Sequence, residues 1–228
     1  KALSKKILTY HRVQTPQFVV YPVGRKIVPA KRLTYPVLVK SATEDASFGI
    51  SQASIVSSDR ALVERVEFVH EKVGSDAMAE EYIEGREFYV GVIGNRRLQT
   101  FPIWEMIFER MPEGVAHIAT ARVKWNPKYQ TRHGIDTRAA RGLSDEQRDR
   151  ISRLCKRVYR HLNMSGYGRI DLRMRNDGEV FVLEANANPN LEYGEDFAES
   201  AESAGISYEA LLQRILNLGL RYDYLWQH

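Results

Sequence analysis

Apolar positions recur along this chain in short blocks, which Gly, Pro, Ser and Asp residues interrupt. That pattern is typical of short strands and helices packed around a core. Three strands are predicted, at 17–21, 35–40 and 77–83. Residues 87–103 are predicted to form a hairpin with Gly94-Asn95 at its turn.

Helical periodicity indicates a short helix at 3–11 and three further helices that follow Ser58, Ser144 and Ser207. Serine is a preferred N-cap residue, and Ser144 with Gln147 forms a capping-box signature. The helix after Ser144 carries an apolar stripe made of Ile151, Leu154, Val158 and Leu162.

Residues 104–143 show no clear period, are rich in Arg and aromatic residues, and are predicted to form a long irregular segment. Loops of that length are usually functional or mobile. Elsewhere, hairpins dominate over strand–helix–strand units, which favours an α+β fold over a doubly wound parallel sheet.

Length and composition indicate a globular chain. With 228 residues, 43% of them hydrophobic and 27% charged, the chain forms one large domain or two smaller subdomains. No apolar run is long enough for a bilayer, so no membrane partner is expected. The only cysteine, Cys155, excludes a disulfide within the chain and fits a reducing compartment, which predicts the cytoplasm.

Charge is distributed unevenly. The net charge is +4, yet no Asp or Glu precedes Glu44. The basic residues of that stretch are Lys1, Lys5, Lys6, Arg12, Arg25, Lys26, Lys31, Arg32 and Lys40. These residues could bind the phosphates of a nucleotide or of nucleic acid, or they could form a solvated basic surface. Because no nucleic-acid-binding motif accompanies them, no nucleic-acid partner is expected.

The stretch at 166–188 carries the candidate chemistry. Asp177-Gly178 predicts a two-residue hairpin turn, so that facing residues have numbers adding to 355. Asp171 then faces Glu184, and Arg169 faces Asn186. The opposite face is predicted to be apolar and to consist of Ile170, Leu172, Met174, Phe181, Leu183 and Ala185.

Facing carboxylates destabilise a sheet unless a cation separates them. Two carboxylates ~5 Å apart repel by about 3 kcal/mol at an effective dielectric constant of about 20. Asp171 and Glu184, with the amide of Asn186, offer hard oxygen ligands that suit Mg²⁺ or Mn²⁺. The hairpin alone also fits a solvated face on which Arg173 and Arg175 neutralise the acids.

The order of several motifs resembles the ATP-grasp superfamily, and within it the D-alanine–D-alanine ligase-like carboxylate–amine ligases. The resemblance runs from Lys1 to about Asp196 and includes "GRIDLRMRNDGEVFVLEANANPN", which is similar to the metal-binding hairpin of that family. It implies that Asp171, Glu184 and Asn186 ligate two Mg²⁺ ions on the phosphates of ATP. Arg169 would face the transferring phosphoryl group.

The same resemblance assigns nucleotide contacts. "YPVLVKSATEDASFGIS" is similar to the strand and phosphate-covering loop of the smaller ATP-grasp subdomain, which carries Lys40 and Ser47. "VKWNPKY" is similar to the segment that delivers a second, catalytic phosphate-binding lysine, here Lys128. Lys1 matches the lysine that opens the central domain of the family.

"AEEYIEGREFYVGVIGN" is similar to the hinge strand that holds adenine and ribose. The residues assigned to the nucleotide here are Glu80, Glu81, Tyr82, Ile83 and Glu87. Backbone groups of Glu81 and Ile83 would pair with the base, and Glu87 would bind the ribose hydroxyls.

An ATP-grasp fold of two α+β subdomains with mostly antiparallel sheets is therefore expected. Residues 1–83 would form the smaller subdomain and 84–228 the larger one. The N-terminal substrate domain of the family has no counterpart here, so the chain is expected to be part of a longer protein or a shorter natural variant. A homodimer is compatible with this interpretation.

The expected activity is ATP-dependent amide formation through an acyl phosphate, from small-molecule carboxylate and amine substrates. Asn190 replaces a family glycine and 191–200 is acidic, which disfavours D-alanine as acceptor and allows either a cationic substrate or a solvated loop. Arg132, His133, Arg138 and Arg141 are candidates for a lid or for binding a carboxylate substrate. The alternatives are ligation onto a protein or peptide end, a nucleotide-binding scaffold without turnover, and a basic nucleic-acid-binding module.

Overall fold

The computed structural model describes residues 1–44 and 49–222, and they divide into two compact units. Unit 1 consists of Lys1–Leu3, Pro16–Glu84 and Ile107–Asp136. Unit 2 consists of Ser4–Thr15, Gly85–Met106 and Thr137–His228. Each unit thus collects segments from both sides of the division between residues 83 and 84 that the sequence suggested.

A four-stranded antiparallel sheet forms the centre of unit 1, in the order β1-β4-β2-β3. Its strands are β1 (Phe18–Tyr21), β2 (Val37–Ser41), β3 (Ile55–Val56) and β4 (Ala77–Glu81). Helix α2 (Asp59–Phe68) packs on the sheet through Leu62 and Val66, and the short helices η1 (Gln52–Ser54) and η2 (Val69–Val73) flank it. The Ser58 hydroxyl accepts a hydrogen bond from the Ala61 N–H, which confirms the predicted cap.

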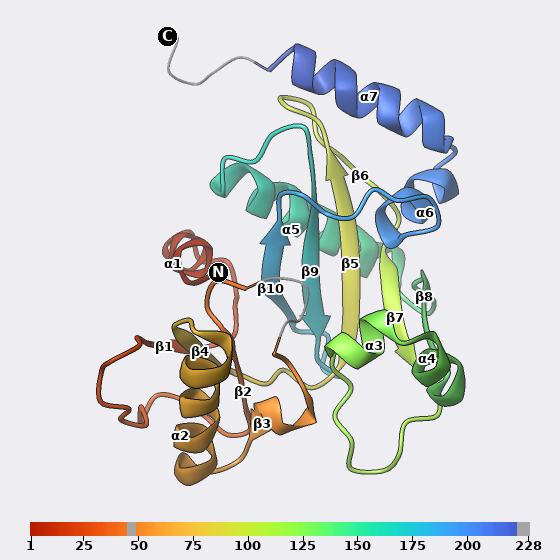
Figure 1. Cartoon of the computed structure of the whole chain (residues 1–228). Helices are drawn as coiled ribbons and strands as arrows, with labels where there is room; N and C mark the ends of the chain where they lie inside the picture. The colour runs from red at the N-terminus through yellow and green to blue at the C-terminus, as the bar shows by residue number, and fades with distance from the viewer. Residues whose placement is uncertain (45–48, 223–228) are drawn as a thin grey trace, which may run out of the picture. The chain divides into compact units, whose positions relative to one another are not determined.

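A larger antiparallel sheet has the order β10-β9-β5-β7-β8, and β6 pairs with the end of β5 (Figure 1). Its strands are β5 (Arg86–Ile93), β6 (Gln99–Thr100), β7 (Trp104–Phe108), β8 (Ile135–Ala139), β9 (Tyr167–Met174) and β10 (Val180–Asn186). The predicted α+β class with antiparallel sheets is therefore confirmed.

Helices of unit 2 enclose its core. They are α1 (Ala2–Tyr10), whose first residues belong to unit 1, α5 (Asp145–His161), α6 (Asp196–Ser203) and α7 (Tyr208–Leu220). Both hydrogen bonds of the predicted capping box form between Ser144 and Gln147 at the start of α5. Of the predicted stripe, Ile151 and Val158 are fully buried, whereas Leu154 is partly buried and Cys155 takes a core position.

The stretch at 104–143 is not irregular, contrary to the prediction. Besides β7 and β8 it contains the short helices α3 (Ala121–Trp125) and α4 (Pro127–His133). Thr120 and Asn126 cap these helices, and Gly134 ends α4 in a left-handed conformation. These elements are five to seven residues long. A helix of that length makes fewer than two turns, and a strand of that length has only a few alternating positions, so neither produces a recognisable hydrophobic period.

The hairpin of β9 and β10 has the predicted register at its open end. Asp171 faces Glu184, and Arg169 faces Asn186. At its closed end the prediction is wrong, because Val180 faces Met174 and the partner numbers add to 354. The turn contains three residues, 176–178: the Arg175 N–H donates to the Glu179 carbonyl, and the Gly178 N–H donates to the Arg175 carbonyl.

A β-bulge at Leu183 restores the predicted register, since the pairing shifts by one residue between Val182 and Glu184. The shift also changes which residues enter the core. Val180 and Val182 pack in the main cluster, whereas Phe181 faces Arg173 on the other side and lies under the Arg175 guanidinium. The predicted apolar face is therefore wrong at Phe181 and Leu183.

Helix α6, which the sequence did not reveal, is anchored on β5. Phe197 is 1% exposed and packs edge-on against Phe101, with ring centroids 5.3 Å apart. Gly91 of β5 leaves room for both rings, because a Cβ there would lie 2.6 Å from a Phe101 ring carbon and 3.1 Å from a Phe197 ring carbon. The first turn of α6 is therefore fixed at the middle of the sheet.

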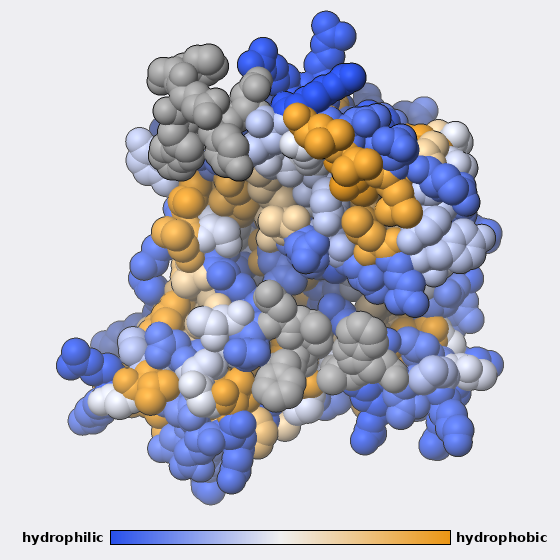
Figure 2. Space-filling view, turned by 45° about the horizontal axis from the view of Figure 1, so that its top comes forward, coloured by the Kyte–Doolittle hydropathy of each residue, from blue (hydrophilic) through white to orange (hydrophobic). Residues whose placement is uncertain are grey.

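Helix α7 exposes an apolar side. Leu212, Leu216 and Leu220 are spaced by one helical turn and are all exposed, and Figure 2 shows apolar side chains gathered over this helix. Across residues 1–44 and 49–222, no helix combines the length and apolarity that crossing a bilayer requires.

Substituting Gly91→Ala should destabilise the chain by about 1–3 kcal/mol, because the added methyl group must displace two buried rings. Urea unfolding followed by circular dichroism measures the effect. Gly219→Ala is the matched control: a Cβ there meets no atom within 4 Å, and alanine in a helix should stabilise α7 by roughly 0.5–1 kcal/mol. Equal stabilities of the two variants would contradict the close packing of Phe101 and Phe197 over Gly91.

Cys155 should resist thiol reagents in the native chain. Its side chain is fully buried in the core, and burial raises the pKa of the thiol far above its usual range, so the reactive thiolate is scarce. Labelling with an aromatic disulfide reagent at pH 8 should be slow without urea and give one thiol per chain in urea. Fast labelling of the native chain would show that α5 opens readily.

Candidate functional site

One face of the large sheet is apolar and the other gathers polar side chains. Residues two apart on a strand share a face, and the registers of β5, β9 and β10 set them in cross-strand rows. Three neighbouring rows on the polar face are Glu87–Arg173–Phe181, Tyr89–Asp171–Glu184 and Gly91–Arg169–Asn186. The four residues predicted from the hairpin therefore share one surface with β5.

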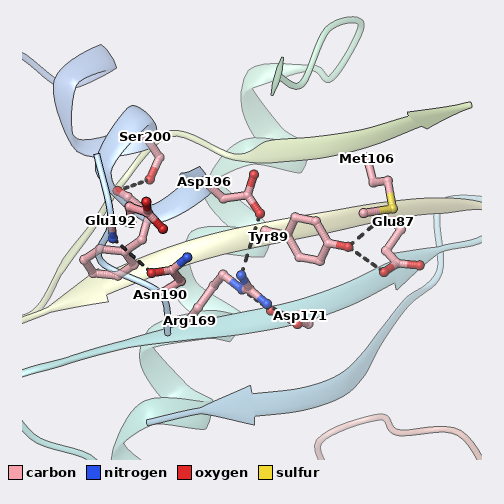
Figure 3. A network of polar contacts seen from close by, with 10 residues as sticks. Glu87, Tyr89, Met106, Arg169, Asp171, Asn190, Glu192, Asp196 and Ser200 are labelled. Atoms are coloured by element: carbon pink, nitrogen blue, oxygen red, sulfur yellow. Dashed lines mark hydrogen bonds and ion pairs between the residues drawn. The ribbon is translucent and has the colours of Figure 1, made fainter. Parts of the chain in front are cut away.

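Arg169 is the centre of a network of charged groups (Figure 3). Its Nε donates to one Asp171 carboxylate oxygen at 2.7 Å, and its Nη2 donates to the other at 2.9 Å. Such two-pronged pairs fix both distance and direction. Burial lowers the pKa of Arg169, but the charge and hydrogen bonds of Asp171 more than offset this, so that the pKa is raised.

Tyr89 contacts two charged side chains, Arg169 through its ring and Glu87 through its hydroxyl group. The Arg169 guanidinium carbon stands 4.7 Å from the centre of its ring, a cation–π distance. The Tyr89 hydroxyl donates to a Glu87 carboxylate oxygen at 2.8 Å. Burial raises the pKa of Tyr89 well above its usual range, and the nearby carboxylates Glu87 and Asp171 add to the effect. Tyr89 therefore acts as a neutral hydrogen-bond donor.

Glu87 is held from a second side. Arg173 donates to its other carboxylate oxygen from Nε at 3.0 Å and from Nη2 at 2.7 Å, and both residues are buried. Glu87, predicted to bind ribose, thus lies on the polar face of unit 2 with partners on both oxygens.

The loop after β10 contributes more carboxylates. Asp196, the first residue of α6, places an oxygen 3.6 Å from Arg169 Nη1. Asn190 organises the loop by accepting a hydrogen bond from the Glu192 N–H at 3.0 Å. Burial raises the pKa of Glu195, and the neighbouring Asp196 and Glu192 charges raise it further. The polar face therefore carries more carboxylates than arginines, and Arg169 and Arg173 are each paired with one of them.

The donor set of the hairpin fits a hard divalent cation. Asp171 and Glu184 face each other, and Asn186 adds an amide on the same face. The Asn186 side-chain oxygen accepts from the Asn188 N–H at 2.9 Å, which fixes its orientation. Within the residues that the structure describes, no group of three His, Cys, Asp or Glu side chains could hold a metal ion alone. Mg²⁺ often has such a sparse protein set, completed by substrate phosphates and water.

Unit 1 holds the other predicted nucleotide residues. The Lys40 ammonium lies 2.5 Å from the Glu80 carboxylate, and both side chains are almost fully buried. The Lys1 ammonium donates to the Glu44 carbonyl at the start of the phosphate-covering loop. Lys128 is exposed in the first turn of α4, and Ser47 lies outside the described residues.

The hinge residues Glu80–Ile83 end β4 and begin the connection to β5. The Glu81 N–H donates to the Gln17 carbonyl at 2.8 Å, so that a contact of Glu81 with adenine would use its carbonyl oxygen. The Tyr82 N–H donates to the Pro36 carbonyl at 3.0 Å. Ile83 is buried.

Predicted residues therefore fall into two sets. Unit 2 gathers the hairpin residues and Glu87 on one polar face, whereas unit 1 contains the lysines and the hinge residues. Sequence reasoning did not assign Tyr89 or Arg173 to the site, and it considered Asp196, with Glu192 and Glu195, only as acids that could favour an amine-bearing substrate. The first two could have been found from the two-residue period of their strands, since each is two residues from a predicted site residue on the same face.

Comparison with known proteins reveals one family over most of the chain. The family model described as "D-ala D-ala ligase C-terminus" matches residues 8–217. An uncharacterized protein, y4sG, of Sinorhizobium fredii is 31% identical over 221 residues, which cover 97% of this chain and 62% of that protein. The D-alanine–D-alanine ligase of Pediococcus pentosaceus is 30% identical over 216 residues, covering 95% and 56%. The chain thus spans less than two thirds of these relatives.

Solved structures share the fold at low sequence identity. The D-alanine–D-alanine ligase of Bacillus anthracis complexed with ATP superposes with a TM-score of 0.76 at 24% identity, covering 97% of this chain and 65% of that one. The VanG D-Ala:D-Ser ligase of Enterococcus faecalis gives 0.71 at 20% identity, covering 94% and 60%. The chain has the ATP-grasp fold and belongs to the family of D-alanine–D-alanine ligase C-terminal domains.

Proposed function

We propose that this chain binds MgATP and forms the ATP-binding part of a carboxylate–amine ligase. One observation carries the proposal: in a chain of the D-alanine–D-alanine ligase family, Asp171 faces Glu184 and Arg169 faces Asn186 on a single polar surface. Arg169 balances the charge of Asp171, and the further negative charge of the facing Glu184 would attract a divalent cation to this position.

Asp171, Glu184 and Asn186 would hold one or two Mg²⁺ or Mn²⁺ ions. Phosphate oxygens of the nucleotide would complete the set of metal ligands. When bound, Mg²⁺ supplies positive charge that neutralises the phosphates. Asp171 is already held at both oxygens by Arg169, so its carboxylate is oriented before any ligand arrives.

Arg169 would stabilise the phosphoryl group in transfer, because its charge is fixed at the surface where the predicted metal ligands lie. Lys40, Lys128 and Lys1 would neutralise the nucleotide phosphates, together with backbone groups near Ser47. Glu80–Ile83 would bind adenine, and Glu87 would bind ribose.

The proposed reaction has two steps. A substrate carboxylate oxygen attacks the γ-phosphorus, the bond to the β-phosphate oxygen breaks, and ADP and an acyl phosphate result. An amine then attacks the acyl carbon, phosphate leaves with the bonding electrons, and the amine proton passes to solvent or a nearby base. This chain contributes positioning and charge, which dominate catalysis of phosphoryl transfer.

Acceptor choice is proposed to differ from D-alanine. Asn190, Glu192 and Glu195 surround the start of α6, next to the Asp196–Arg169 ion pair. A free amino-acid carboxylate would be repelled by these acids, whereas a substrate with an additional amine would be attracted. Because the chain spans little more than half of its relatives, the identities of both substrates depend on the whole natural protein.

A nonhydrolysable ATP analogue should raise the unfolding temperature by about 5–10 °C at 100-fold excess over its Kd, with Mg²⁺ present. The variant Asp171→Asn with Glu184→Gln should lose the Mg²⁺-dependent part of this shift, because its metal ligands lose their charge. Differential scanning fluorimetry with and without EDTA measures both values.

The matched control is Glu146→Gln with Asp149→Asn, which removes the same charge from exposed positions of α5. It should keep the full shift. An equal Mg²⁺-dependent shift in all three proteins would exclude the hairpin as the metal site.

Hydroxylamine should trap the acyl phosphate. In the complete natural protein with MgATP, hydroxylamine and candidate amino acids, ADP and a hydroxamate should appear in equal amounts, since hydroxylamine replaces the acceptor amine. Amino acids with a second amine are the first to try. ATP binding without ADP or hydroxamate for any amino acid would instead favour a nucleotide-binding scaffold.

A further inference from the structure

Arg169 has a carboxylate partner that lies outside the predicted metal ligands. Asp171 contacts Nε and Nη2 of the guanidinium, and Asp196 faces Nη1 at 3.6 Å. All three nitrogens of the group therefore have a carboxylate nearby. The two acids come from different elements, one from β9 and one from α6.

The two carboxylates differ in what else they would bind. Asp171 is a proposed metal ligand, and a bound cation would compete with Arg169 for its oxygens. Asp196 belongs to no such set, so its attraction for Arg169 would persist when the metal site is filled. Asp196 could therefore keep Arg169 oriented while a metal ion occupies the Asp171 carboxylate.

The position of Asp196 is fixed by packing. It is followed directly by Phe197, which is buried against Phe101 and above Gly91. The Ser200 hydroxyl donates to the Phe197 carbonyl at 2.9 Å within the same helix. Gly91 is also the cross-strand neighbour of Arg169, so the helix anchor and the arginine occupy adjacent strands.

The side chain of Asp196 is directed at Arg169 and not used to cap its own helix. Glu195 is the N-cap residue of α6 and makes no side-chain cap hydrogen bond. Figure 3 shows the Asp196 carboxylate pointing to the arginine, on the opposite side from Asp171. Tyr89 supports the guanidinium face while the two acids restrain its edges.

We propose that Asp196 is a positioning residue, which holds the Arg169 guanidinium over Tyr89 so that it meets the phosphoryl group in transfer. The inference rests on the proposed function, because it takes Arg169 to face that group. It assigns to the first residue of α6 a role in the chemical step that is separate from substrate recognition.

The first measurement needs no nucleotide. In ¹⁵N NMR spectra, the side-chain signals of Arg169, assigned by their loss in Arg169→Lys, should show restricted guanidinium rotation. Asp196→Asn should speed that rotation and the exchange of the Nη protons. Glu202→Gln, which removes one charge from an exposed position of the same helix, should leave both unchanged. Unchanged rotation in Asp196→Asn would overturn the proposal.

The second measurement compares MgADP with MgADP–aluminium fluoride, a mimic of the phosphoryl group in transfer. Asp196→Asn should weaken the aluminium fluoride complex about 10-fold and change the Kd of MgADP by less than about twofold, as expected when the partner of a site residue is lost. Asp196→Glu, which keeps the charge, should restore most of the affinity. Equal weakening of both complexes would indicate a general structural role and overturn the proposal.

A double-mutant cycle separates positioning from helix stability. In the Arg169→Lys background, Asp196→Asn should have no further effect on the aluminium fluoride complex, because the geometry that it supports is already lost. Additive losses would overturn the proposal. If the unsubstituted protein binds neither MgADP complex, the proposed function fails and the inference fails with it. If it binds both and Asp196→Asn behaves identically, only the positioning role fails.

Discussion

The pairing of β9 with β5 on one side and with β10 on the other is the constraint on which the candidate site depends. Each strand contributes one residue to each row, so that the separation and direction of the polar groups follow from backbone hydrogen bonds. Moving β9 by a single residue toward either neighbour would replace Asp171 with Ile170 or Leu172, both of which are core residues. The apolar face, which packs on α5, therefore maintains the register that the polar face uses.

The buried charges of each unit are organised in pairs. Arg169 with Asp171 and Arg173 with Glu87 lie in unit 2, and Lys40 with Glu80 lies in unit 1. Buried ion pairs contribute little net stability, yet removing one partner is costly. The role of such pairs is better understood as holding each side chain in one orientation. Electrostatic catalysis requires groups that are already oriented toward the charge that develops in the transition state.

Much of this arrangement could be predicted from local chemistry. The caps at Ser58, Ser144 and Ser207 followed from residue type and spacing, and all three form. The facing of Asp171 and Glu184 was predicted correctly although the turn was not, because a three-residue turn and a bulge displace the register in opposite senses.

The remaining details had no local signal. In β10 the run "VFVLEA" is apolar at four consecutive positions, so alternation cannot distinguish Val180 and Val182 from Phe181 and Leu183 as core residues. The ion pair of Asp196 depends on where α6 packs, which is set by a glycine and two aromatic rings far apart in the sequence. Contacts of that kind are tertiary, and no window of neighbouring residues encodes them.

The bulge at Leu183 divides the hairpin into a segment that carries the site residues and a tip whose length can vary. Beyond it lies a tip, residues 176–178, which lies outside the main core cluster and whose Gly178 carbonyl accepts a hydrogen bond from Arg150 of α5. Because pairing on the site side is fixed by β5 and by the bulge, the tip can lengthen without moving Glu184 or Asn186. Exposed turns are the places where chains accept insertions. Divergence among relatives, or a probe introduced by an experimenter, can therefore be accommodated there while the site keeps its geometry.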